Sequence, residues 1–220
     1  MNPAVIFDLD GTLIDSAPDI HASANRAFAP LGQSFSRAEV QGFVGRGAPN
    51  LISRLAQSRG LPGTGAAFDD LLARFLEIYQ QSHGLTALYP GVLTALDDLA
   101  RTGARLGVCT NKPIGPTRAV LGHFRLGCFA AVVGGDSLPV KKPDPEPLLH
   151  ALDLLGGGPV IFVGDSEVDA ETAQAARVPF LLFTEGYRKT PVEALPHLAA
   201  FADFADLPGL VAGISASAAP

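Results

Sequence analysis

The sequence predicts an α/β fold in which helices cover a parallel sheet and a helical insertion follows the first strand. Three observations support this fold class. Short apolar runs without polar–apolar alternation recur along the chain, as in strands that are buried on both faces. Helix-length amphipathic segments separate the later runs, which indicates parallel strands joined by right-handed crossovers. A long stretch after the first run contains helical patterns but no convincing strand.

Five short runs rich in β-branched or aromatic residues are the expected strands. They are Ala4–Phe7, Arg105–Cys109, Ala130–Val133, Val160–Val163 and Pro179–Phe183. Amphipathic segments at 91–103, 145–156 and 167–177 are the expected helices between the later strands, and a glycine ends each of the first two.

The helical insertion is expected to form a small second domain. Its helical patterns cover 18–32, 49–60 and 66–84, and prolines and glycines interrupt them, notably in Leu61–Gly65. We therefore divide the chain into a core of residues 1–15 and 87–213 and an all-α domain of residues 16–86. Residues 214–220 contain little apolar surface, so we expect a loose tail there.

Composition limits the classes of protein that the chain can represent. The 220 residues include 16 Lys and Arg against 22 Asp and Glu, a formal charge of −6, which argues against a nucleic-acid-binding face. The apolar runs are too short to cross a bilayer, and no signal peptide is recognisable. The two cysteines, Cys109 and Cys128, cannot build a disulfide framework, so we expect a cytoplasmic protein.

Polar residues gather where the expected strands end. In an open parallel sheet, ligands bind outside the carboxyl ends of the strands, so these residues are expected to meet. Those after the strands are Asp8, Asp10, Thr110, Asn111, Lys112, Asp165, Ser166 and Asp169, and a lysine of the segment KKPDPEP (141–147) precedes another helix.

This combination of side chains fits the chemistry of phosphoryl transfer. Clustered carboxylates need a compensating cation, and Mg²⁺ accepts a few carboxylates while keeping water and phosphate oxygens. One carboxylate can attack phosphorus, and a second can transfer protons, which is worth about 10²–10⁴ in rate. A lysine and a hydroxyl supply the charge and the positioning that phosphoryl transfer requires.

Each of these residues also has a plain structural interpretation. Asp-Gly after a strand is a common turn signal, and a Thr-Asn pair can cap a helix. Lys141 is as available to the site as Lys142, and Ser166 with Asp169 spells a capping box at a helix start. The convergence of several motifs on one sheet edge is stronger than any one of them and favours the chemical interpretation.

In order along the chain, DLDGTLIDS, TN, KKPDPEP and GDSEVDA resemble the four motifs of the haloacid dehalogenase superfamily. The presence of Asp10 is typical of its phosphatase branch, and segments such as CTNKP and FTEGYR resemble the bacterial phosphoglycolate phosphatases. The resemblance implies a Rossmann-like, three-layer α/β/α core with a parallel sheet. It also implies that the helical insertion is a cap domain.

The resemblance assigns a metal site as well. Asp8 would be both the nucleophile and a ligand of Mg²⁺. Asp10 would be the general acid and base, and its backbone carbonyl would also reach the metal. Asp165 would supply the second carboxylate ligand. Ser166 and Asp169 would lie behind these ligands, where Asp169 would steady metal-bound water or the lysine.

The remaining assignments concern the phosphorylated substrate. Thr110 would hydrogen-bond the phosphoryl group, helped by backbone amides near Gly11 and Asn111. Lys142, directly before a proline, would bridge the nucleophile and the phosphoryl oxygens. Arg46, in a Gly-Arg-Gly loop of the insertion, is either a solvent-exposed arginine or a partner for a substrate carboxylate, which a planar guanidinium suits.

The sequence thus predicts a Mg²⁺-dependent phosphoric monoester hydrolase with an aspartyl-phosphate intermediate. Its expected reaction converts 2-phosphoglycolate to glycolate and phosphate. The alternatives are a phosphosugar phosphatase, a β-phosphoglucomutase-like mutase, a pyrophosphatase, or an inactive protein that binds phosphorylated metabolites. The expected partner is a small phosphorylated metabolite, without nucleic acid or membrane, and the protein is expected to be a monomer or a homodimer.

Overall fold

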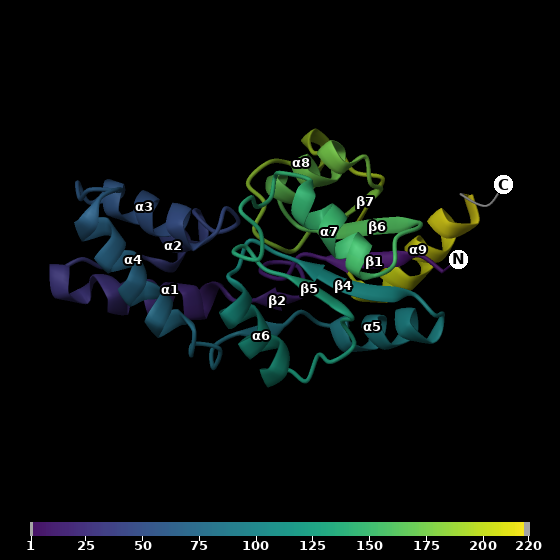
Figure 1. The fold of residues 1–220 in the computed structure, drawn as a ribbon, viewed down its shortest axis with the longest axis horizontal. Coiled ribbons are helices and arrows are strands. Elements are labelled where there is room, and N and C mark those ends of the chain that lie inside the picture. The colour runs from purple at the N-terminus through teal and green to yellow at the C-terminus, as the bar shows by residue number, and fades with distance from the viewer. Residues whose placement is uncertain (1, 218–220) are drawn as a thin grey trace.

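The computed structural model describes residues 2–217 and shows helices on both faces of a central sheet (Figure 1). Within these residues the sheet has six strands in the order β5-β4-β1-β6-β7-β8, and every neighbouring pair is parallel. The strands are β1 (Ala4–Phe7), β4 (Arg105–Cys109), β5 (Ala131–Val133), β6 (Val160–Gly164), β7 (Phe180–Phe183) and β8 (Ala199–Phe201).

Two hydrophobic clusters, one on each face, hold the helices to the sheet. Val5 and Phe7 of β1 pack on one face with apolar residues of α5, α6 and α9, whereas Ala4 and Ile6 pack on the other with α7 and α8. The helices are α5 (Val92–Arg101), α6 (Ile114–His123), α7 (Glu146–Leu154), α8 (Glu167–Ala176) and α9 (Leu207–Ser217). This three-layer α/β/α arrangement confirms the predicted fold class.

The other helices lie beside the core in a group of their own (Figure 1). Two short strands, β2 (Ile14–Asp15) and β3 (Ala87–Leu88), pair antiparallel where the chain leaves and rejoins the core. Between them lie α1 (Ala17–Phe28), α2 (Arg37–Gln41), α3 (Ala48–Ser58) and α4 (Ala66–Tyr79). These helices share a separate buried cluster that includes Phe28, Leu55 and Phe75, which supports the proposed cap domain.

Some elements were not anticipated, and one expectation was wrong. The edge strand β8 has only three residues, α2 has only five, and α6 and α9 are weakly amphipathic. Residues 214–217 continue α9 instead of starting a loose tail, because Leu207 and Val211 anchor that helix and Ile214 packs beside them. The rest of that segment, 218–220, lies outside the described residues.

Short 3-10 helices complete the described chain at Ala29–Leu31, Val192–Ala194 and Phe204–Asp206. Across residues 2–217, the helices are all too short or too polar to span a bilayer.

Candidate active site

The carboxyl ends of three adjacent strands form the floor of the site. Because β1 lies between β4 and β6, the residues that follow these strands are brought together. Asp8 continues β1 and donates its backbone N–H to the Val163 carbonyl at 2.8 Å. Thr110 follows β4, and Asp165 follows β6. The sheet order therefore explains why side chains more than one hundred residues apart share one edge.

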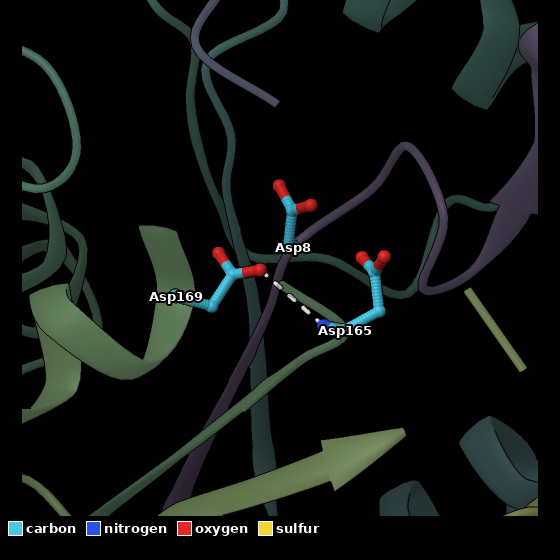
Figure 2. A group of neighbouring side chains, drawn as sticks. All are labelled: Asp8, Asp165 and Asp169. Carbon is cyan, nitrogen blue, oxygen red and sulfur yellow. Dashed lines mark hydrogen bonds between the residues drawn. The ribbon is translucent and has the colours of Figure 1, made fainter. Parts of the chain in front are cut away.

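Three buried carboxylates meet at this edge (Figure 2). Asp8, Asp165 and Asp169 each place an oxygen within 4.8 Å of the others, and Asp165 and Asp169 are each only 1% exposed. The backbone N–H of Asp165 donates to Asp169 Oδ2 at 3.3 Å, which ties the start of α8 to the end of β6.

Lys142 supplies the positive charge that contacts this cluster. Its Nζ lies 2.8 Å from Asp8 Oδ1 and 2.6 Å from Asp169 Oδ1, and the side chain is buried. Burial opposes the charge on this ammonium, but the carboxylates of Asp169 and Asp8 outweigh burial and raise the pKa of Lys142 above its ordinary value. Lys142, and not the partly exposed Lys141, makes these contacts.

The cluster still carries more negative charge than one lysine balances. Burial raises the pKa of Asp8 to about 6 although Lys142 lowers it, and burial raises the pKa of Asp165 well above its ordinary value. Such shifts show that the folded chain holds carboxylates whose charge is incompletely compensated. A hard divalent cation such as Mg²⁺ fits this donor set, because it binds carboxylate and carbonyl oxygens.

Contacts from distant parts of the chain fix the Asp165 side chain. Thr12 Oγ1 donates to Asp165 Oδ1 at 2.8 Å, and the Tyr187 backbone N–H donates to Oδ2 at 2.6 Å. Gly11 and Gly186 crowd the same carboxylate, since a Cβ on either would lie 2.5 or 2.3 Å from Asp165 Oδ2. Sequence reasoning missed Thr12, Tyr187 and Gly186, which carry no chemistry themselves.

The conformation of Gly11 shapes the turn that follows Asp10. Its φ of +92° is a region that glycine adopts without strain, and its N–H donates to the Ile14 carbonyl at 2.8 Å. That N–H is therefore engaged within the turn, and Gly11 lines neither cavity described below. Phosphoryl binding by the backbone near Gly11 stays a prediction, and at Gly11 itself it requires the N–H to leave the Ile14 carbonyl.

Asp169 makes both the contacts expected of a capping box and the contact expected with the lysine. Its Oδ2 accepts hydrogen bonds from the Ser166 backbone N–H at 3.1 Å and from Ser166 Oγ at 2.6 Å, at the start of α8. Its Oδ1 contacts Lys142. One carboxylate thus orders the first turn of a helix and holds the lysine beside Asp8.

Asp10 lies beside the cluster and has partners of its own. Ser16 Oγ donates to Asp10 Oδ1 at 2.6 Å, and Lys112 Nζ lies 3.0 Å from the same oxygen. Lys112 also donates to the hydroxyl of Tyr79, a residue of the cap helix α4. Sequence reasoning placed Lys112 at this edge but gave it no role. The sequence feature that pointed to a role for Lys112 was its position directly after Thr110 and Asn111.

Thr110 and Asn111 line a cavity at this sheet edge and do not cap α6. The first N–H of that helix, on Ile114, donates instead to Asp136 Oδ1 at 2.7 Å. Asn111 Nδ2 donates to the Gly45 carbonyl at 3.0 Å and to the Lys142 carbonyl at 2.9 Å. Asn111 therefore joins the lysine segment of the core to a loop of the cap.

Two cavities open from Asp8 and Asp10 between core and cap. The first has a volume of about 40 Å³, room for about three waters. It is lined by Asp8, Asp10, Ile20, Val44, Gly45, Gly47, Ala48, Leu51, Phe75, Tyr79, Thr110, Asn111, Lys112 and Pro113. The second has a volume of about 300 Å³ and is lined by Asp8, Asp10, Val44, Gly45, Arg46, Asp165, Ser166, Glu167, Val168, Glu171, Tyr187, Lys189 and Thr190.

Arg46 belongs to the second cavity. Its side chain is 51% exposed, and its Nη2 lies 3.7 Å from Glu171 Oε2 on α8. The structure thus places Arg46 near Asp8 and Asp10 but outside the smaller cavity that Thr110 and Asn111 line.

Comparison with known proteins identifies the class that this fold and site define. The sequence model of the haloacid dehalogenase-like hydrolases matches residues 5–183, and the chain belongs to that family. The resemblance inferred from the motifs is confirmed.

Two similar proteins are phosphoglycolate phosphatases. The chain is 47% identical to the phosphoglycolate phosphatase of Rhodobacter capsulatus, over 97% of this chain and 98% of the relative. It is 49% identical to the phosphoglycolate phosphatase of Cereibacter sphaeroides strain ATCC 17025, over 95% and 97%.

Solved structures agree with these relatives. A predicted phosphoglycolate phosphatase from Haemophilus somnus 129PT superposes with a TM-score of 0.88 at 31% identity, covering 95% of this chain and 97% of that one. CbbY from Rhodobacter sphaeroides, in complex with phosphate, gives a TM-score of 0.75 at 25% identity, with 94% and 96% covered.

Proposed function

We propose that the chain is a Mg²⁺-dependent phosphatase that hydrolyses 2-phosphoglycolate to glycolate and phosphate through an aspartyl-phosphate intermediate. The observation that carries the proposal is the contact of Lys142 with Asp8 inside a buried carboxylate cluster at the sheet edge. The phosphoglycolate phosphatases that share nearly half of its residues support the choice of substrate.

In the first step, Asp8 attacks the phosphorus atom and the ester bond to the leaving oxygen breaks. Asp10, which lines both cavities, donates a proton to that oxygen so that glycolate leaves as the alcohol. Lys142 faces Asp8 and offsets negative charge as the phosphoryl group is transferred. Thr110, which lines the smaller cavity, hydrogen-bonds that group.

In the second step, Asp10 accepts a proton from a water molecule, which attacks the phosphorus of the aspartyl-phosphate. The bond between phosphorus and the Asp8 oxygen breaks, inorganic phosphate leaves, and both aspartates return to their starting states. The contacts of Ser16 and Lys112 with Asp10 Oδ1 hold the carboxyl group in one orientation for both transfers.

Mg²⁺ would be held by the side chains of Asp8 and Asp165 and by the backbone carbonyl of Asp10. When bound, it would neutralise phosphoryl charge and orient the substrate. Asp169 is the less available carboxylate of the cluster, because its Oδ1 pairs with the Lys142 ammonium and its Oδ2 accepts from Ser166 and from the Asp165 N–H. Each Asp165 oxygen accepts only one uncharged donor.

The cap supports a small substrate. Apolar residues of the cap, Ile20, Val44, Leu51 and Phe75, cover the smaller cavity and exclude bulk water from its polar floor. At about 40 Å³ the smaller cavity must widen for any phosphate ester, and a two-carbon acid requires less widening than a hexose. Opening of the cap would then admit substrate and release products.

The test is release of free phosphate from 2-phosphoglycolate, hexose phosphates, pyrophosphate and a nucleotide, each with Mg²⁺ and with excess EDTA. We expect a kcat/KM preference for 2-phosphoglycolate that EDTA abolishes. Comparable turnover of the other esters would reject the named substrate and keep the chemistry. Isomerisation of a sugar phosphate without phosphate release would instead identify a mutase, and no turnover of any kind would identify a binding protein.

A further inference from the structure

Lys112 is a buried cation that lines the smaller cavity. Its side chain is only 4% exposed, and its Nζ contacts Asp10 Oδ1 at 3.0 Å and the Tyr79 hydroxyl. An ammonium group has three N–H donors, so these two contacts leave one donor unassigned. The proposed steps use Lys112 only to orient Asp10, and its position offers more than that.

We propose that Lys112 binds the carboxylate of the substrate and thereby selects phosphorylated acids over phosphate esters whose alcohol portion carries no charge. This inference rests on the proposed function, because it names the group that recognises the non-reacting end of the proposed substrate. It assigns selectivity to the core segment that follows β4.

Distance is the first argument for this role. To protonate the leaving oxygen, Asp10 must come within hydrogen-bond distance of it. In 2-phosphoglycolate the carboxylate carbon is only two bonds from that oxygen. Lys112 Nζ lies 3.0 Å from the Asp10 carboxylate, so a substrate that engages Asp10 brings its own carboxylate within reach of Lys112.

Charge is the second argument. Among the described residues that line the smaller cavity, Lys112 is the only lysine or arginine. The walls around it are mostly apolar, and in such surroundings a carboxylate–ammonium contact is stronger than in water. The N-terminus of α3, at Gly47 and Ala48, lines the same cavity and adds a partial positive charge.

The second cavity is a poorer place for a substrate carboxylate. Asp165, Glu167 and Glu171 add negative charge to its lining, which Arg46 and Lys189 offset only in part, and Arg46 already faces Glu171 at 3.7 Å. An anion that approached Arg46 would have to displace that partner and meet the other carboxylates. The charge distribution therefore favours Lys112 over Arg46 as the selecting cation.

The experiment compares kcat/KM for 2-phosphoglycolate with kcat/KM for ethyl phosphate, which has a methyl group where the acid has its carboxylate. The quantity of interest is the ratio of the two in the wild type, in Lys112→Met and in Arg46→Met. Loss of the Asp10 contact in Lys112→Met slows both substrates and cancels in the ratio. We expect that variant to lower the ratio by at least about 30-fold, and Arg46→Met to change it by less than about threefold.

The outcomes separate the inference from the function on which it rests. A wild-type ratio near one would overturn the inference and the named substrate, and would keep the phosphatase chemistry. A high wild-type ratio that Lys112→Met leaves intact would overturn the inference alone, because Lys112 would then act only through Asp10. A fall confined to Arg46→Met would assign carboxylate recognition to Arg46. Circular dichroism and thermal unfolding verify folding, and Lys112→Gln, which can still hydrogen-bond Tyr79, replaces Lys112→Met if that variant does not fold.

Discussion

The core side and the cap side of the site are held in different ways. On the core side, buried polar groups hold one another, since Lys142 joins Asp8 to Asp169 and Thr12 fixes Asp165. On the cap side, the cavity walls are largely apolar. The loop that carries Gly45 and Arg46 is linked to the core by the hydrogen bond to the Gly45 carbonyl and by the exposed ion pair between Arg46 and Glu171. The sheet edge therefore fixes the buried carboxylates and the lysine between them, whereas the cap shapes the cavity beside them.

Substitution of the nucleophile should have the largest effect. Asp8→Asn removes the attacking oxygen, so we expect kcat to fall by more than about 10³-fold. Stability should not fall with it, because burial already disfavours the charged carboxylate at neutral pH. Phosphate release and thermal unfolding measure the two effects. Asp153→Asn, on the exposed side of α7, is the control, and residual turnover near the wild-type rate in Asp8→Asn would reject the mechanism.

A cavity in the cap should destabilise the cap without removing the reacting groups. Leu55 is fully buried within the cap cluster, so Leu55→Ala should cost about 2–5 kcal/mol. Hydrogen exchange should accelerate in α1–α4 more than in the central strands. Leu154→Ala, at a side chain that is 55% exposed on α7, should change stability by less than about 0.5 kcal/mol. Equal acceleration in both regions would show that cap and core unfold as one unit.

The link between the two sides should have an intermediate effect. Asn111→Ala leaves the carbonyls of Gly45 and Lys142 without their donor, at a cost of about 1–3 kcal/mol, so we expect kcat/KM to fall by about 10- to 100-fold. Asn25→Ala is a matched control, because that side chain bonds Phe35 and His21 within the cap. It should lower stability and spare kcat/KM. A similar loss of kcat/KM in both variants would argue against a specific link at Asn111.

The smallest effect is expected at the exposed start of α2. Hydrogen bonds from the Ser36 backbone and from Arg59 lower the pKa of Glu39 from 4.5 to about 2. The ionised carboxylate therefore stabilises the folded state above about pH 4.5, and this contribution is lost as the pH falls toward 2. Denaturant midpoints should separate the wild type from Glu39→Gln slightly at about pH 6 and less at about pH 3.5. Glu77→Gln, on α4, is the control, and a gap that widens in acid would reverse the assignment.

The candidate site residues that could be predicted from the sequence are those that directly follow a predicted strand. Asp8, Thr110 and Asp165 each follow an apolar run, and parallel strands deliver such residues to one edge whatever their separation. The five expected strands were found within one residue of their predicted limits. The continuous apolar character of these strands reflects burial on both faces, which is a local property that the sequence displays directly.

Contacts between residues that lie far apart in the chain could not be predicted from the sequence. Nothing in the stretch around Tyr187 indicates that its N–H would hold Asp165 or that its hydroxyl would donate to Asp15 Oδ1 at 2.7 Å. The choice of Lys142 over Lys141 also depends on how that segment enters α7. Short or weakly amphipathic elements such as β8 form because the sheet edge and the neighbouring helices pack against them, and local propensity gives little sign of that.

The hairpin formed by β2 and β3 has a consequence for how such a chain can diversify. Asp15 lies opposite Ala87, so the cap leaves and returns at a single point beside the sheet. An insertion joined there does not shift the register of the central strands. A lineage can therefore exchange the whole cap for another and acquire a new substrate range while it inherits the same reacting groups.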